Sequence, residues 1–139
     1  MEIAIFSGAL CFAPSMAEMA DPILVVDDDV WARETMAQLL HLEGFAPVTA
    51  ANGLEALEFL RAGGRAKVIL LDLVMPVMDG WTFCEEQQRD PRFAAIPVVV
   101  LTATEGSRTL AATASFRKPF DYPRVINFVR DLCGRPAGR

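Results

Sequence analysis

Short apolar runs, each long enough for a strand and each followed by a helical pattern, constrain the fold of this chain most strongly. The run 23–27 (ILVVD) is continuous and rich in β-branched residues, which is typical of a strand buried on both faces of a parallel sheet. The later runs are 47–51 (PVTAA), less apolar and nearer an edge, 67–72 (KVILLD), 96–103 (IPVVVLTA) and the weak 113–116 (TASF). Repeated units of this length predict an α/β fold whose parallel sheet has helices on both faces.

Apolar residues at helical spacing fill the intervals between these runs. Asn52 with Glu55 resembles a capping box at the start of the second helix, and Gly44 is placed to stop the first. The predicted helices span 30–43, 52–63, 81–88 and 121–134.

Composition bounds the class of protein. A chain of 139 residues with 53% hydrophobic and 22% charged residues predicts one folded domain with a sizeable core. The 13 basic and 18 acidic residues give a net charge of -5 without a basic patch, which disfavours nucleic acid and anionic lipid as partners. Cys11, Cys84 and Cys133 share no ligand-like spacing and leave one unpaired, so we expect no disulfide framework or zinc site and a cytoplasmic location.

The first twenty residues form an extension to a domain over 21–134, and 135–139 form a short tail. The apolar part of the extension is too short to span a bilayer and lacks the positive region of a secretory signal. Met16 and Met19 favour a start codon assigned too early. The alternative is that Ile3, Ile5 and their neighbours form an added strand or a dimer contact.

Polar residues stand where the predicted strands end. Asp27 and Asp28 follow the first strand, Asp72 ends the third, Thr102 ends the fourth and Lys118 follows the fifth. Because the carboxyl ends of parallel strands share one edge of the sheet, a single crevice could collect all five side chains. Clustered carboxylates repel one another, and a bound hard divalent cation such as Mg²⁺ would neutralise that repulsion. Beside the cation, Asp72 could attack an activated phosphorus while Mg²⁺, Lys118 and the Thr102 hydroxyl neutralise the oxygens of the phosphoryl group.

Each of these residues also has an ordinary structural explanation. Asp27, Asp28 and Asp29 could simply cap the following helix, and Asp72 could be a turn residue. Thr102 could bond nearby backbone and Lys118 could be solvated. Their joint placement favours a site. His41, the only histidine, is expected to be packed or on the surface, and Met75 with Met78 to pack a loop against the core.

The runs ILVVDDD, VILLDLVMPVMDG, VVVLTA and RKPF together resemble the receiver domain of two-component response regulators, over residues 22–132. The spacings from Asp28 to Asp72 and from Asp72 to Thr102 are those of typical receivers. The resemblance implies a flavodoxin-like, doubly wound sheet of five parallel strands in the order 2-1-3-4-5.

The resemblance also implies a set of roles. Asp72 would be phosphorylated to 4-aspartylphosphate, and Asp28 would bind Mg²⁺ directly, together with Asp72 and the backbone carbonyl of Val74. Asp27 would assist through water.

Thr102 and Lys118 would contact the phosphoryl group, the Lys118–Pro119 peptide would be cis, and the donor would be a histidine kinase or a histidine phosphotransfer protein.

Two features depart from the typical receiver. The interval from Thr102 to Lys118 is short, so the fourth helix, which SRTLAATA at 107–114 should supply, is expected to be shortened or absent. Three residues before the lysine, where receivers carry an aromatic switch residue, this chain has Ser115, with Phe116 next to it. Either Phe116 takes that role, or the signal leaves by another surface.

We therefore expect a stand-alone receiver, since seven residues follow Leu132. It would act on a downstream protein target by contact, without binding nucleic acid or membrane, and catalyse at most its own phosphorylation and dephosphorylation. A homodimer stays open. The alternative is a phosphorylation-independent docking adaptor with the receiver fold; a magnesium-dependent phosphatase is remote because the chain offers no substrate-binding cap.

Overall fold

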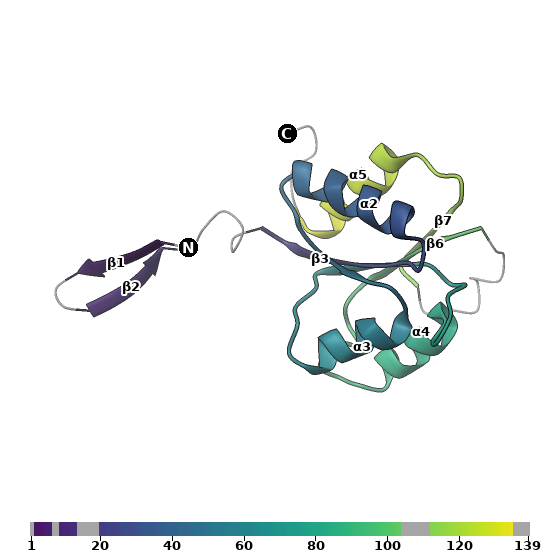
Figure 1. Ribbon diagram of the computed structural model, residues 1–139, viewed down its shortest axis with the longest axis horizontal. Coiled ribbons are helices and arrows are strands. Elements are labelled where there is room, and N and C mark those ends of the chain that lie inside the picture. The colour runs from purple at the N-terminus through teal and green to yellow at the C-terminus, as the bar shows by residue number, and fades with distance from the viewer. Residues whose placement is uncertain (1, 7–8, 14–19, 104–111, 135–139) are drawn as a thin grey trace.

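A five-stranded parallel sheet forms the centre of the structure. The computed structural model describes residues 2–6, 9–13, 20–103 and 112–134 (Figure 1). The strands of this sheet are β3 (Pro22–Val26), β4 (Ala46–Ala50), β5 (Val68–Leu71), β6 (Val98–Thr102) and β7 (Ala114–Arg117). They lie in the order β4-β3-β5-β6-β7, and every neighbouring pair is parallel. Counted along the chain this order is 2-1-3-4-5, which confirms the predicted flavodoxin-like topology.

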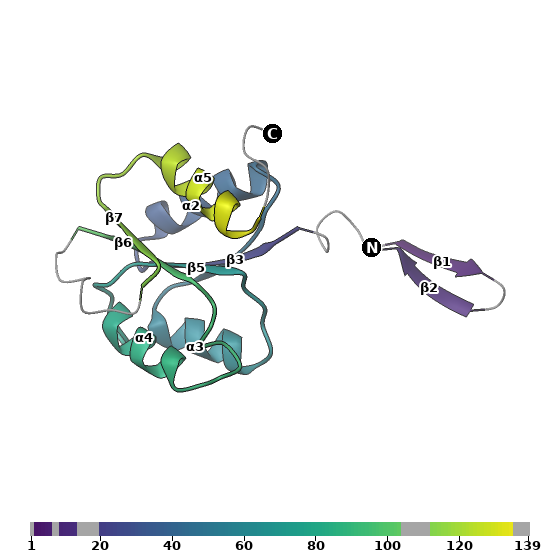
Figure 2. The same ribbon diagram turned by 180° about the vertical axis from the view of Figure 1, so that it is seen from behind.

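Two pairs of helices cover the two faces of the sheet. Figures 1 and 2 show α2 (Val30–Leu42) and α5 (Tyr122–Leu132) on one face, and α3 (Gly53–Arg61) and α4 (Gly80–Gln88) on the other. Alternate residues of each strand serve the two sides, because successive side chains of a strand point to opposite faces. The α2–α5 side buries Ile23 and Val25, whereas the α3–α4 side buries Leu24 and Val26.

The edge strands are the polar ones. All residues of β5 and β6 are buried, as are four of the five in β3, so these strands read as continuous apolar runs. In β4 only Ala50 is buried, and none of the β7 residues is. The prediction that the less apolar run lies at an edge is confirmed, since β4 ends the sheet on one side.

The helices begin and end at residues suited to these positions. Asn52 Oδ1 accepts from the Glu55 amide at 2.9 Å, as the capping box predicts, although Glu55 returns its bond to the amide of Ala51 instead of Asn52. The first helix stops before Gly44, whose φ of 91° favours glycine. Met75 and Met78 pack against the core on the α3–α4 side as expected, and His41 is exposed.

Phe116 and Ser115 lie on different faces of β7. Phe116 packs with the α2–α5 side and meets Phe128 edge-on, with ring centroids 5.8 Å apart. Ser115, one residue earlier in the strand, keeps the position three residues before Lys118 and is exposed. The aromatic ring is therefore directed at α5.

The N-terminal extension contains two strands. β1 (Glu2–Phe6) and β2 (Ala9–Ala13) pair with each other, antiparallel, in a sheet of their own. The predicted fourth helix falls largely on residues 104–111 and the predicted tail on 135–139, which lie outside the described residues. Among the helices that the structure describes, none is long and apolar enough to cross a bilayer.

Candidate functional site

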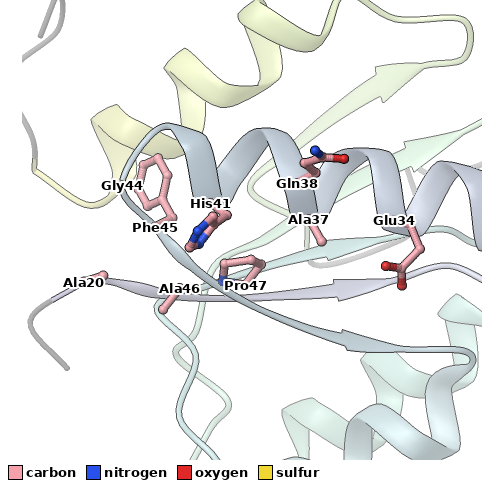
Figure 3. Close-up of a pocket in the computed structure, with 9 residues that line it drawn as sticks. All are labelled: Ala20, Glu34, Ala37, Gln38, His41, Gly44, Phe45, Ala46 and Pro47. Atoms are coloured by element: carbon pink, nitrogen blue, oxygen red, sulfur yellow. The ribbon is translucent and has the colours of Figure 1, made fainter. Parts of the chain in front are cut away.

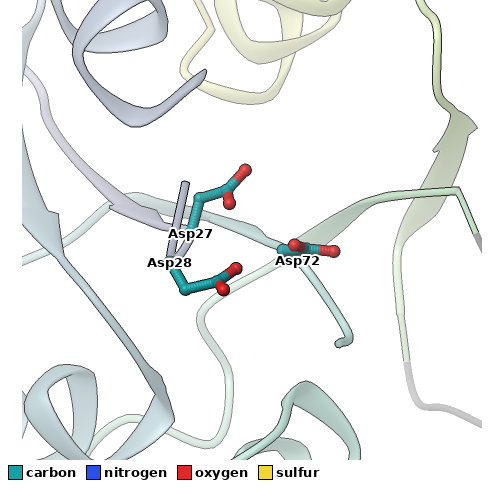
Figure 4. A group of neighbouring side chains, drawn as sticks. All are labelled: Asp27, Asp28 and Asp72. Atoms are coloured by element: carbon teal, nitrogen blue, oxygen red, sulfur yellow. The ribbon is translucent and has the colours of Figure 1, made fainter. Parts of the chain in front are cut away.

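Three carboxylates meet where β3 and β5 end. Val26 and Leu71 are register partners, and the Asp72 amide donates to the Val26 carbonyl at 2.9 Å, so the aspartates that follow the two strands become neighbours. One oxygen each from Asp27, Asp28 and Asp72 lies within 4.8 Å of the others, and Figure 4 shows the three side chains at this edge. The sequence prediction that these residues come together is confirmed.

Asp27 is held on several sides. Its side chain is nearly buried; Oδ1 accepts from the Asp29 amide at 2.9 Å and Oδ2 from Lys118 Nζ at 3.0 Å. Its carbonyl accepts from Arg33 Nη1 at 2.8 Å. The capping explanation fits Asp29, which accepts from the amides of Trp31 and Ala32 at the start of α2. Asp28 stays exposed and presents its carboxylate to the cluster.

Lys118 reaches the cluster from the end of β7. Its amide donates to the Thr102 carbonyl at 2.9 Å, and the Lys118–Pro119 peptide is cis, as the resemblance implied. Its Nζ lies 3.0 Å from Asp27 Oδ2 and 3.6 Å from Asp72 Oδ2. Burial disfavours the charged ammonium, but the hydrogen bond and the charge of Asp27, with that of Asp72, outweigh it and raise the pKa of Lys118.

The surroundings of Asp72 disfavour its charged form. Burial, and then the charge of Asp27, raise its pKa against the opposing effect of Lys118 and of the backbone amides of Leu73 and Val74. Leu73 donates to Oδ1 at 2.8 Å. Helix α4 begins close by because Gly80 has no side chain: a Cβ there would lie 2.6 Å from the Asp72 carbonyl oxygen.

The other two predicted residues differ in exposure. Thr102 ends β6 and is buried, and its backbone carbonyl accepts a hydrogen bond from the Lys118 amide. Val74, two residues past Asp72, is 58% exposed on the loop that leads to α4.

Two features of the site were missed by sequence reasoning. Arg33 lies on α2 and its side chain is largely buried. It belongs to the site through the hydrogen bond that its Nη1 donates to the Asp27 carbonyl. Val77 has a φ of 70°, in the left-handed region of backbone conformation. This conformation costs a β-branched residue about 1–3 kcal/mol of strain. The Pro and Gly of VMPVMDG indicate a loop, but no signal in the sequence singles out Val77.

The donor set fits a hard divalent cation. Three carboxylates and one ammonium leave a net charge of two negatives when all are ionised, and all the ligand atoms offered by the aspartates are oxygens. Magnesium is bound in this way, through one or two carboxylates with waters and a phosphate oxygen. The cluster could therefore bind Mg²⁺ and present the Asp72 carboxylate beside it.

The structure combines a parallel sheet in the order 2-1-3-4-5 with an acidic cluster and a lysine at the carboxyl edge of that sheet. Comparison with known protein families identifies the class of protein that has these features. The model of the response regulator receiver domain matches residues 23–129. The chain belongs to this family, whose members take part in two-component signalling.

The relatives are response regulators. The chain is 38% identical to response regulator Rre1 of Synechocystis over 127 residues, which cover 84% of this chain and 54% of Rre1. It is 35% identical to the transcriptional regulatory protein CpxR homolog of Haemophilus influenzae, with 83% and 51% covered. The chain thus spans about half the length of the curated relatives it matches.

A solved structure shows the same fold with ligands. The response regulator protein TrrA from Thermotoga maritima, in complex with Mg(2+)-BeF, superimposes with a TM-score of 0.71 at 29% identity. The alignment covers 81% of this chain and 98% of that one.

Proposed function

We propose that this protein accepts a phosphoryl group on Asp72 in a Mg²⁺-dependent reaction and holds it as an acyl phosphate. The observation that carries the proposal is the placement of Lys118 Nζ, 3.0 Å from Asp27 and 3.6 Å from Asp72, beside three carboxylates within 4.8 Å of one another. Phosphoryl transfer asks a protein mainly for positioning and charge neutralisation, and this arrangement offers both.

The metal would be held by Asp28, Asp72 and the backbone carbonyl of Val74, with Asp27 acting through water. Mg²⁺ supplies charge neutralisation for the phosphoryl oxygens. The exposure of Asp28 and Val74 supports these assignments, because a cation that retains waters needs ligands that solvent can reach.

The carboxylate of Asp72 would be the nucleophile. One of its oxygens forms the new bond to phosphorus while the bond from phosphorus to the donor breaks and the donor keeps the electron pair. Leu73 donates to Asp72 Oδ1, which leaves Oδ2 on the side of Lys118. Lys118 and the Thr102 hydroxyl would then bind the phosphoryl oxygens.

The donor would be a histidine kinase or a histidine phosphotransfer protein, and output would pass by contact to a downstream protein in the cytoplasm. The added charge would act as a shift between two surface states. We propose no direct contact of this chain with nucleic acid or membrane, since its net charge is -5. Beyond its own phosphorylation and dephosphorylation we propose no enzyme activity.

A second candidate is a docking adaptor that works without phosphorylation. It is favoured by Ser115, which stands where typical receivers have their aromatic switch residue. The close assembly of three carboxylates and a lysine favours the phosphoacceptor, because an adaptor gains nothing from carboxylates that repel one another.

Beryllofluoride, bound with Mg²⁺ in the TrrA complex, offers a direct test. We expect Mg²⁺ with beryllofluoride to raise the Tm of the wild type more than Mg²⁺ alone, and to have no such effect on Asp72→Asn. Asp79→Asn is the matched control and should respond as the wild type does. Asp79 is the N-cap of α4, and its Oδ1 accepts a hydrogen bond from the Thr82 amide at 2.8 Å. An equal response of wild type and Asp72→Asn would refute the assignment of Asp72.

A further inference from the structure

Arg33 lies on the face of α2 that is turned toward the sheet. Met36 and Leu40 of this helix are buried in the core on the α2–α5 side, and Arg33 precedes them by three and seven residues, which is helical spacing. The side chain of Arg33 is 16% exposed. Because burial of a charge is costly without a partner, the contact that this guanidinium makes is informative.

The pairing of Arg33 with the next residue does not explain its burial. Glu34 lines an open groove beside α2, together with Ala37, Gln38 and His41 (Figure 3). Its Oε2 lies 4.0 Å from Arg33 Nε, and 63% of its side chain is exposed. An ion pair of this length and exposure contributes little to stability.

The guanidinium instead contacts the backbone of the acidic cluster. Arg33 Nη1 donates to the Asp27 carbonyl oxygen at 2.8 Å, in a partly buried hydrogen bond. A hydrogen bond from a charged donor is roughly twice as strong as one between neutral groups. The Asp27 carbonyl belongs to the planar peptide that leads to Asp28, so this bond holds the plane of that peptide.

The peptide on the other side of Asp28 is held as well. The Asp29 amide donates to Asp27 Oδ1 at 2.9 Å, which holds the plane of the peptide between residues 28 and 29. The φ and ψ angles of Asp28 are the rotations between these two planes. The two hydrogen bonds together therefore set the direction in which the Asp28 side chain leaves the backbone, and one of them depends on Arg33.

Asp28 depends on its backbone more than the other two carboxylates do. Among the residues that the structure describes, none donates a hydrogen bond to the exposed Asp28 carboxylate. Asp27 and Asp72 each accept from a backbone amide, and both lie beside Lys118. An Asp28 oxygen still lies within 4.8 Å of an oxygen of each of the other two aspartates (Figure 4).

We propose that Arg33 is a positioning residue for the Mg²⁺ site: by holding the Asp27 carbonyl it directs the Asp28 carboxylate into the cluster. The inference rests on the proposed function of Asp28 as a ligand of Mg²⁺. It adds a residue of α2 that would contact neither the metal nor the phosphoryl group. Loss of a residue that holds metal ligands in place typically weakens metal affinity by about 10- to 100-fold.

The affinity for Mg²⁺, measured by isothermal titration calorimetry, tests the proposal because charge and position predict opposite effects. Removal of a positive charge beside three carboxylates should by itself tighten the binding of a cation. Loss of positioning should weaken it. We expect Arg33→Met and Arg33→Ala each to raise the Kd for Mg²⁺ by about 10- to 100-fold. Arg33→Lys keeps the charge and a donor, so it should recover part of the affinity.

Phosphorylation by acetyl phosphate gives a second readout, which a merely stabilising role of Arg33 would not move. The Mg²⁺ concentration that gives the half-maximal rate of adduct formation should rise in Arg33→Met by the same factor as the Kd. The rate at saturating Mg²⁺ should stay close to that of the wild type, because Asp72 and Lys118 are unchanged. Arg89→Met is the matched control, since Arg89 pairs with Glu86 and 70% of its side chain is exposed. It should behave as the wild type in both measurements.

The outcomes separate this proposal from the proposed function. Thermal melts identify which of Arg33→Met and Arg33→Ala are folded. A wild type that binds Mg²⁺, beside a folded variant whose Kd is equal or lower, overturns the positioning role and leaves the role of Asp72 intact. A wild type that binds no Mg²⁺ overturns both.

Discussion

Lys118 Nζ donates a 3.0 Å hydrogen bond to Asp27 Oδ2, although the two residues are 91 positions apart in the sequence. The contact links the residue that follows β3 to the residue that follows β7, at the carboxyl edge of the parallel sheet. The same ammonium lies 3.6 Å from Asp72. One lysine therefore contacts both Asp27, a proposed metal-site carboxylate, and Asp72, the proposed phosphoacceptor. We expect its charge to matter for the stability of the site as well as for its chemistry.

Loss of that charge should destabilise the protein. We expect Lys118→Met to lower the free energy of unfolding by about 1–3 kcal/mol without Mg²⁺, because it leaves two nearly buried carboxylates facing each other. Urea unfolding measures the change, and Mg²⁺ should restore part of it. Since the pKa of Lys118 is raised, its contribution should be complete at neutral pH and fade only at alkaline pH, as the pH passes that pKa.

The control for this variant is Lys67→Met. Lys67 lies 3.3 Å from Asp21 with 54% of its side chain exposed, so its loss should cost less than about 0.5 kcal/mol. Equal losses for the two variants would contradict the special role of Lys118.

Asp72→Asn should stabilise the protein in the absence of metal. Burial and repulsion raise the pKa of Asp72, so the ionised carboxylate is tolerated at a cost, and the amide should raise the Tm by a few degrees, on the order of 1 kcal/mol. Because the folded state holds this proton more tightly than the unfolded state, wild-type stability falls as the pH rises from about 4 through the folded pKa. Thermal melts should therefore show no gain for the variant at low pH and the full gain near pH 7.

Asp28 and Asp29 should separate metal binding from helix capping. Mg²⁺ at a hundredfold excess over its Kd should stabilise the wild type by about 2.7 kcal/mol, and Asp28→Asn should remove this effect. Asp29→Ala should instead lose an N-cap worth about 1 kcal/mol and keep the response to Mg²⁺. A normal Mg²⁺ response in Asp28→Asn would show that the cluster is not the binding site.

Trp31 should report metal binding by its fluorescence. It lies three residues past Asp28, at the start of α2, and is 83% exposed. We expect Mg²⁺ to change the emission of the wild type and of Trp81→Phe, but not that of Trp31→Phe. A wild-type signal that does not respond at any Mg²⁺ concentration would speak against a metal next to Asp28.

Most of the fold could be predicted from the sequence because each local signal agrees with the global arrangement. The runs that become β3, β5 and β6 are apolar since both faces are buried, and Asn52 caps α3 as its spacing from Glu55 predicts. The meeting of Asp27, Asp72 and Lys118 followed from the rule that parallel strands share their carboxyl edge.

The rest depends on three-dimensional contacts that leave no pattern in the sequence. Three consecutive aspartates look alike as caps, and only the direction of the chain into α2 gives that role to Asp29. The reach of Arg33 back to the Asp27 carbonyl and the left-handed backbone of Val77 depend on rotamer and loop geometry. The pairing of β1 with β2, and not with the central sheet, is equally invisible to apolar periodicity.

Intact mass spectrometry after incubation with acetyl phosphate and Mg²⁺, on the wild type beside Asp72→Asn, tests the central claim most directly. We predict a single phosphoryl adduct on the wild type that hydroxylamine removes and EDTA prevents, and no adduct on Asp72→Asn. An adduct of the same yield on Asp72→Asn, or none on the wild type with either acetyl phosphate or a phosphorylated histidine kinase, would contradict the assignment of Asp72 as the phosphoacceptor.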